Sequence, residues 1–189
     1  MVKFSNFTVQ LVLLACLFAL YSCDKVKDTT KTEINVESAS IELDEITVSA
    51  TKSTAGDLNP FAASQIIKLE DIQGMSSDAV KYRSNIESAH VGPVSIEITT
   101  TDDNGTVVQN LVLKATGIDA DYTVTEYKLG EVYSPDMEKL QKFANLILMK
   151  LFVSDSVEVS AAGVTDIISG EKLRIKITMK DIKLTAKLL

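Results

Sequence analysis

Alternation of apolar and polar residues is the feature that most constrains how this chain can fold. Segments in which every second side chain is apolar recur along it, at 41–50, 94–99, 107–113, 122–129, 157–161 and 172–188. A period of two places alternate side chains on opposite faces of a strand, so each segment predicts a strand with one buried face. Asn104-Gly105 lies between two of these segments and favours a hairpin turn. The pattern therefore predicts a mainly β, antiparallel fold.

Three other segments depart from this period. Residues 61–71 fit either a short helix or a strand, and residues 80–91 are predicted to be extended. Residues 136–152 carry apolar side chains at helical spacing, after Ser134 and Pro135, which suit the cap and the first position of a helix. The apolar surface of this helix is wider than one stripe, so we expect it to be covered on more than one side. The prediction is an antiparallel β-sandwich with one apolar α-helix.

The alternation slips by one residue at Asp44-Glu45 and again at Lys180-Asp181. One extra residue restores a single buried face, so each slip predicts a β-bulge. The segments around the slips, 41–50 and 177–186, match type for type without a gap. We interpret them as two independently bulged strands, with an internal duplication as the alternative.

Charge is distributed unequally between the first and the last predicted strand. The first carries Glu42, Asp44 and Glu45, whereas the last carries a basic row formed by Lys172, Arg174, Lys176, Lys180, Lys183 and Lys187. Opposite charges across a strand pair are stabilising, so we predict that these two strands are sheet neighbours. We interpret the basic row as a solvated strand face, and contact with anionic head groups or a partner is the alternative.

An apolar run over residues 11–20 follows Lys3 and ends near Ser22 and Cys23. It is shorter than the roughly 20 apolar residues of a membrane span, and its parts are those of a secretory signal. The ending Leu20-Tyr21-Ser22-Cys23 resembles a bacterial lipobox. That resemblance implies that residues 1–22 are a signal peptide and that Cys23 becomes the lipidated N-terminus. An ordinary signal peptide and a buried apolar strand are the alternatives.

The same resemblance divides the chain and places the protein. Residues 23–39 are polar and mixed in charge, which is typical of a lipidated tether, and residues 40–189 form one β-sandwich domain. The whole is similar to the small single-domain β-sandwich lipoproteins of Bacteroidota, which are Gram-negative. The implied location is the cell envelope, with the lipid in the inner or the outer membrane and the domain in the periplasm or at the cell surface.

Composition argues against several classes of function. The chain has 19 basic and 26 acidic residues, a net charge of −7, which disfavours nucleic acid as a partner. Cys16 leaves with the signal peptide and Cys23 is acylated, so we expect no internal disulfide and no zinc site of the Cys/His kind. His90 is the single histidine, and we interpret it as a strand histidine rather than as a general base. The sequence contains none of the GxSxG, GxGxxG or Walker patterns.

Four short motifs are weaker candidates. Asp102-Asp103-Asn104-Gly105 and Asp119-Ala120-Asp121 offer oxygen ligands to calcium but lack the rest of an EF-hand loop, so we interpret both as turns. Asp28-Thr29-Thr30 and Asp155-Ser156-Val157 resemble the Asp-Ser/Thr-apolar acceptor of O-glycosylation in Bacteroidota, and the first would be the more exposed.

Three functions remain, in order of preference. The first is a membrane-anchored lipoprotein whose sandwich is a non-catalytic binding or structural module, with no catalytic residue, cofactor or metal. The second is a periplasmic carrier or chaperone for an apolar ligand such as lipid, with the helix at 137–152 lining a groove. The third is a hydrolase that uses two carboxylates. The lipid links the protein to a membrane, and any protein partner or apolar ligand is left open.

Overall fold

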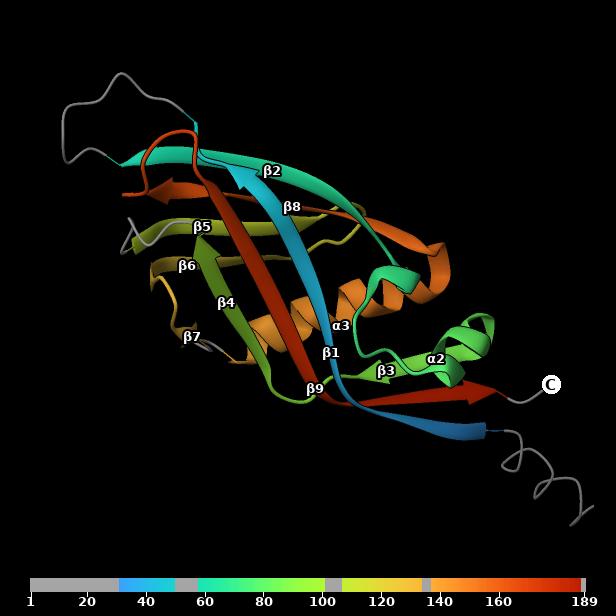
Figure 1. The fold of residues 1–189 in the computed structure, drawn as a ribbon. Helices are drawn as coiled ribbons and strands as arrows, with labels where there is room; N and C mark the ends of the chain where they lie inside the picture. The colour runs from blue at the N-terminus through green and yellow to red at the C-terminus, as the bar shows by residue number, and fades with distance from the viewer. Residues whose placement is uncertain (1–30, 50–57, 101–106, 134–136, 188–189) are drawn as a thin grey trace, which may run out of the picture.

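A computed structural model describes residues 31–49, 58–100, 107–133 and 137–187 of the chain. They form two antiparallel β-sheets packed as a sandwich, with one long helix (Figure 1). The predicted mainly β sandwich with one apolar helix is therefore confirmed. The predicted signal peptide, Cys23, the motif at 28–30 and the Asp102-Asp103-Asn104-Gly105 turn lie outside the described residues.

The strands pair in a nested order across the two sheets. The first sheet runs β1 (Lys31–Thr47), β9 (Lys172–Lys187), β4 (Val94–Thr100) and β7 (Val132–Tyr133), and β3 (Ile86–His90) also pairs with β9. The second runs β2 (Asn59–Lys68), β8 (Ser156–Thr165), β5 (Val107–Ala115) and β6 (Asp121–Lys128). The chain thus pairs β1 with β9, β2 with β8, β4 with β7 and β5 with β6. These nested pairs are those of one long antiparallel hairpin whose successive pairs alternate between the two sheets. This topology is the jelly roll.

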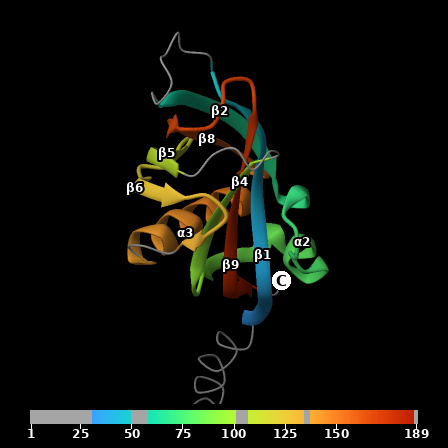
Figure 2. The ribbon, with the colours of Figure 1, turned by 60° about the vertical axis from the view of Figure 1, so that its left-hand side comes forward.

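The helix α3 (Met137–Ser154) lies between the two sheets along one side of the sandwich (Figures 1 and 2). It contacts β3 and β4 of the first sheet and β6 and β8 of the second. Seven of its side chains are buried, namely Leu140, Phe143, Ala144, Ile147, Leu148, Leu151 and Phe152. The expectation that this helix is covered on more than one side is confirmed, because its apolar surface completes the core of both sheets.

Residues 31–39, which the sequence prediction placed in the tether, are instead the first half of β1. They pair with β9 from Lys31 opposite Lys187 to Ala39 opposite Met179. Ile34, Val36 and Ala39 are buried in the core, so this largely polar segment contributes three apolar side chains to the sandwich. Residues 31–39 therefore belong to the β-sandwich rather than to the predicted tether, and residues 23–30 of that tether lie outside the described residues.

Residues 77–85 are helical, whereas the sequence prediction extended a strand over 80–91. The helix α2 (Ser77–Lys81) and the 3₁₀ turn η2 (Arg83–Asn85) precede β3, and only the latter part of the segment is extended. The Ala79 N–H donates to Ser76 Oγ (3.2 Å), and the Ala79 side chain is fully buried, so capping and burial stabilise this short helix. The ambiguous segment at 61–71 is strand β2 followed by the 3₁₀ turn η1 (Leu69–Asp71).

The two predicted bulges have different outcomes. The register of β1 against β9 shifts between Leu43 and Ile46, and Glu45 has a φ of 57°, which confirms the first bulge. Asp181 likewise has a φ of 50°, and β9 changes its buried side between Met179 and Ile182. However, the register with β1 does not shift there, because β1 changes its own buried side at residues 37–38. The second slip is therefore a bend shared by two strands rather than an extra residue in one.

Gly92 joins β3 to β4 on the other side of that bend. Its N–H donates to Lys180 O (2.9 Å), and the Lys180 N–H donates to Pro93 O (2.9 Å), so β3 and β4 follow β9 as one interrupted line. A Cβ on Gly92 would lie 2.8 Å from Lys180 O and 2.9 Å from Asp181 Cβ. Such distances leave no room for a side chain at the bend.

Candidate functional sites

A ladder of opposite charges joins β1 and β9 on the outer face of the first sheet. Glu42 lies opposite Lys176 in the register, and Glu97 of β4 lies opposite the same lysine. Three ion pairs follow one another along the strands: Glu42 Oε1 with Lys176 Nζ (3.1 Å), Asp44 Oδ1 with Arg174 Nε (2.6 Å) and Glu45 Oε2 with Lys172 Nζ (3.0 Å). The prediction that the first and last strands are neighbours is confirmed, as is the pairing of their charges.

This ladder gives half of the basic row a structural role. The side chains of its pairs are between 20% and 74% exposed, so each pair contributes only about 0.2–1 kcal/mol. The other three lysines, Lys180, Lys183 and Lys187, are exposed. Five of the six members are exposed, as both a solvated strand face and a surface for anionic head groups or a partner require, and Lys176 is half-buried.

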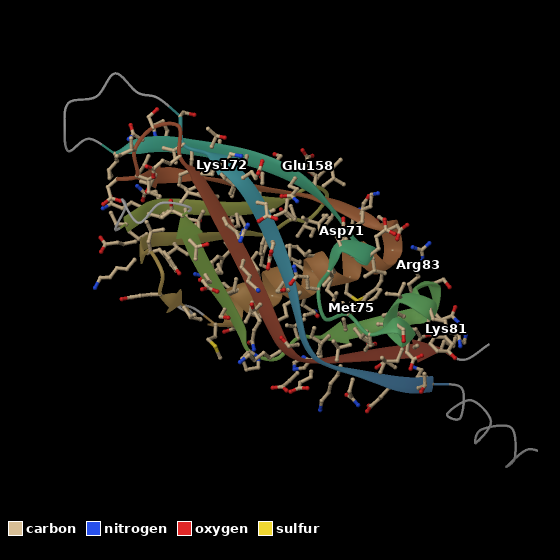
Figure 3. All side chains as sticks on the ribbon, viewed as in Figure 1. Asp71, Met75, Lys81, Arg83, Glu158 and Lys172 are labelled. Carbon is tan, nitrogen blue, oxygen red and sulfur yellow. The ribbon has the colours of Figure 1, made fainter. Side chains whose placement is uncertain are left out.

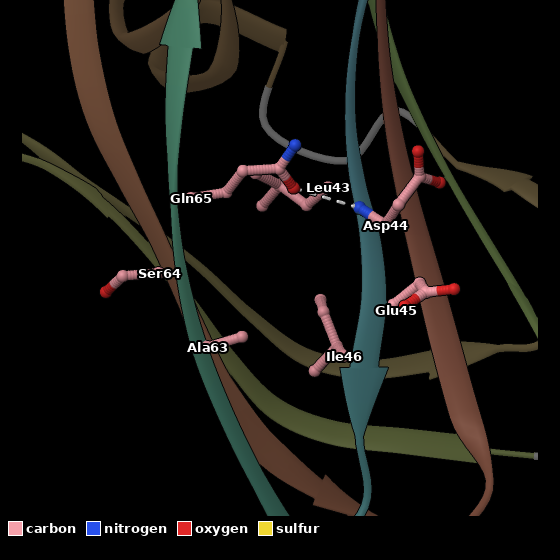
Figure 4. A pocket seen from close by; sticks show the side chains of 7 residues that line it. All are labelled: Leu43, Asp44, Glu45, Ile46, Ala63, Ser64 and Gln65. Atoms are coloured by element: carbon pink, nitrogen blue, oxygen red, sulfur yellow. Dashed lines mark hydrogen bonds between the residues drawn. The ribbon is translucent and has the colours of Figure 1, made fainter.

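A shallow pocket of about 330 Å³ lies where β1 and β2, the edge strands of their sheets, face each other. Figure 4 shows Leu43 and Ile46 of β1 and Gln65 of β2 directed into it, and the Asp44 N–H donates to Gln65 Oε1 (3.1 Å). The Asp44 and Glu45 side chains point away from the pocket, toward β9 (Figure 4). Both carboxylates are engaged by cations there, so the pocket does not hold the pair of convergent acids that glycoside hydrolysis requires.

His90 lies on the exposed side of β3, opposite Lys183 of β9. This placement agrees with the interpretation as a strand histidine.

Asp119 and Asp121 border a shallow depression of about 360 Å³ at the β5–β6 turn, and both are exposed. Among the described residues, no group of three or more His, Cys, Asp or Glu side chains is placed to hold a metal ion.

The second candidate for glycosylation lies where α3 passes into β8. Asp155 has a φ of 65° just after the helix, and its N–H donates to Leu151 O (2.8 Å). Its carboxylate forms an ion pair with Arg83 of η2. Ser156 is the first residue of β8, opposite Lys68 of β2, and is half-buried. In this motif Asp155 therefore ends the helix, and the candidate acceptor Ser156 is a half-buried residue of a paired strand.

Tyr127 of β6 is a polar contact between the sheets that the sequence analysis missed. The Ile98 N–H of β4 donates to Tyr127 Oη (3.0 Å), and the tyrosine is 1% exposed. Burial raises the pKa of Tyr127 above its ordinary value of 10.0, and the nearby charges of Glu97 and Glu131 raise the pKa further, whereas the hydrogen bond from Ile98 opposes them. The hydroxyl thereby satisfies a backbone group of β4 beyond the short strand β7.

The surface around α3 bears on the carrier hypothesis. Phe152 and Val153, at the C-terminal end of the helix, border a shallow pocket of about 400 Å³ together with Arg83 and Ile86. The seven buried side chains of the helix pack between the sheets, whereas Met137 at its N-terminal end is exposed and Leu146 and Met149 are half-buried. In the part of the chain that the structure describes, no helix is long and apolar enough to cross a membrane.

Comparison with known proteins adds only remote likenesses. No family model matches the sequence, and no curated protein is similar to it. A chain of Desmodium yellow mottle tymovirus is 10% identical, and the match covers 84% of this chain and 90% of that one at a TM-score of 0.35. A chain of a semi-empty virus-like particle of Macrobrachium rosenbergii nodavirus is 8% identical, with 84% and 96% covered and the same TM-score of 0.35. Neither likeness bears on the function of this protein.

Proposed function

We propose that this protein is a lipoprotein of the bacterial cell envelope, anchored through Cys23, whose jelly-roll domain is a non-catalytic binding or structural module. The observation that carries the proposal is the apolar run that ends at Ser22 and Cys23. The fold is compatible with such an anchor, because β1 begins at Lys31, shortly after Cys23. The anchor would lie in the inner or the outer membrane, with the domain in the periplasm or at the cell surface.

The placement of the titratable residues supports a non-catalytic domain. The acids beside the β1–β2 pocket, Asp44 and Glu45, form ion pairs with Arg174 and Lys172. His90 lies on the exposed side of β3, opposite Lys183 of β9. A carboxylate hydrolase needs two acids that face one scissile bond, so this arrangement disfavours the third candidate function.

The carrier hypothesis draws on the same apolar helix but receives less support. A carrier would use side chains of α3 to line a groove, and the residues with that character, such as Ile147 and Leu148, are fully buried between the sheets. A ligand could reach them only if the helix moved out of the core. The simpler interpretation is that α3 is a core helix of the binding or structural module.

Membrane fractionation of Cys23→Ala in a bacterial host tests the anchor. We expect the variant to accumulate as an uncleaved precursor or to leave the membrane fraction, because the acylated thiol is lost. Cys16→Ala is the matched control, since Cys16 lies within the apolar run and should not affect processing. Mass spectrometry of the N-terminal peptide should show acyl chains on Cys23 in the wild type and in the control. Membrane association and processing that are the same in Cys23→Ala as in the wild type would refute the proposal.

A further inference from the structure

The end of the sandwich at which β1 begins brings together segments from several parts of the chain. Residues 32–35 of β1 line the same shallow pocket, of about 380 Å³, as Ser76, Asp78 and Tyr82 in and beside α2. Lys31 forms an ion pair with Glu87 of β3 (3.1 Å) and lies opposite Lys187, the last residue of β9. We call this the anchor-side end, defined by Lys31, α2, η2, Lys187 and the C-terminal turn of α3 with Val153.

The anchor-side end combines exposed apolar side chains with cations. Val80 of α2 is 37% exposed and Val153 of α3 is 78% exposed. Lys81 and Lys187 are exposed, and among the described residues no carboxylate forms an ion pair with either of them. The Lys81 ammonium lies 5.0 Å from the centre of the Tyr82 ring, so its stem covers an aromatic side chain while its charge stays at the surface.

Figure 3 shows Lys81 and Arg83 together at this end, with Lys172 toward the opposite end of the molecule. Arg83 and Val153 line one pocket, so the turn η2 and the exposed end of α3 are neighbours, and Arg83 forms its ion pair with Asp155 there. The chain as a whole is acidic, with a net charge of −7. At this end two lysines that form no ion pair among the described residues accompany two exposed valines, and such a combination suits the boundary between anionic lipid head groups and acyl chains.

The position of Cys23 sets how far this end can lie from a membrane. Residues 24–30 separate Cys23 from the first residue of β1, and a fully extended segment of that length spans at most about 25 Å. An unstructured one spans on average about 15 Å. On the basis of the proposed lipid anchor, we propose that the anchor-side end docks on an anionic lipid surface through Val80, Lys81, Lys187 and Val153.

Docking of this end directs the opposite end away from the lipid. The β8–β9 turn lies there, because the Gly170 N–H donates to Val48 O just beyond the last residue of β1 (3.0 Å). Ile168 in this turn is 57% exposed. It therefore offers a matched reference position: it is also an exposed aliphatic residue, but it belongs to the end that faces away from the membrane.

The test uses the full lipidated protein in vesicles that contain phosphatidylglycerol. After signal cleavage and acylation the mature chain has no free thiol, so Val80→Cys or Ile168→Cys provides a single site for a fluorophore. Both positions are exposed, and a thermal melt by circular dichroism checks that each variant folds. We expect brominated lipids to quench the label at position 80 and not the label at position 168. Lys81→Gln should shift the equilibrium from docked to undocked about fivefold, and Lys128→Gln on β6 should not change it.

Each outcome separates the docking proposal from the anchor. If the wild-type protein does not float with the vesicles, the lipid anchor itself is wrong. If it floats but the label at position 80 is not quenched, as expected when a protein partner or solvent covers this end, the docking proposal is overturned. Quenching that is equal in vesicles of phosphatidylcholine alone, and unchanged by Lys81→Gln, would overturn the role of anionic head groups.

Discussion

Replacement of Tyr127 by phenylalanine tests how much the hydrogen bond between its hydroxyl and β4 contributes to the stability of the sandwich. The change keeps the buried ring and removes the acceptor of the Ile98 N–H, which is then left without this partner inside the core. Loss of one partner of a buried hydrogen bond costs about 1–3 kcal/mol, so we expect the free energy of unfolding to fall by that amount near pH 7. Urea denaturation followed by circular dichroism measures it, and Tyr82→Phe, at a half-buried position, should cost less than about 0.5 kcal/mol.

The pH dependence of the same variant provides a second, independent test. Because burial raises the pKa of Tyr127, the unfolded chain loses this proton near pH 10 while the folded protein still retains it. The contribution of a neutral Tyr127 is therefore complete below pH 10 and is lost as the pH rises above that value. We expect the difference in stability between the wild type and Tyr127→Phe to be constant below about pH 9 and to narrow as the pH rises past 10. A cost below about 0.5 kcal/mol at neutral pH, or a difference that widens in alkali, would refute the reasoning.

Three further experiments test the core, the charge ladder and the bend. Leu148→Ala and Leu151→Ala in α3 should each cost about 2–5 kcal/mol in urea denaturation, since both leucines are 0% exposed, and costs below about 0.5 kcal/mol would show that the helix is not part of the core. A double-mutant cycle on Glu42 and Lys176 should give a coupling of about 0.2–1 kcal/mol that weakens in about 1 M salt, and coupling that is independent of salt would contradict an ion pair. Gly92→Ala should cost about 1–3 kcal/mol because its Cβ would lie 2.8 Å from a backbone oxygen of β9, and an unchanged melting temperature would show that the bend can open.

The fold class could be predicted because alternation records which side chains face the core. The buried residues of β9, such as Leu173, Ile175 and Ile177, occupy the positions at which the pattern predicts them. Charge added long-range information, since acids on one strand and bases on another predicted the pairing of β1 with β9. Long-range pairing is usually beyond pattern analysis, and it succeeded here because the two complementary rows lie on strands that both face water on one side.

The first half of β1, the short helix α2 and the hydrogen bond of Tyr127 could not be predicted. Alternation of apolar residues records neither helix caps nor contacts between the two sheets. Residues 31–39 are polar and mixed in charge, which predicts a tether, and the change of buried side at 37–38 interrupts the alternation that would have indicated a strand. The short helix α2 depends on the Ser76 cap and on burial of Ala79, and neither produces an apolar period. The partner of Tyr127 is a backbone N–H on the other sheet, so only the folded structure identifies it.

The resemblance between residues 41–50 and 177–186 has a physical explanation that requires no duplication. Glu45 and Asp181 occupy equivalent positions in the two segments, and their φ angles of 57° and 50° lie in the left-handed region, which costs about 1 kcal/mol for a residue with a side chain. In both segments this residue follows a charged one and precedes a buried isoleucine, so one local conformation returns the apolar residues to the core. Its consequences differ, however: the slip at Glu45 shifts the register of β1 against β9, whereas the slip at Asp181 is matched by a change in β1 and leaves the register intact. The two strands use the same left-handed residue but pair differently. The need to return apolar side chains to the core therefore explains their similarity better than duplication of a segment does.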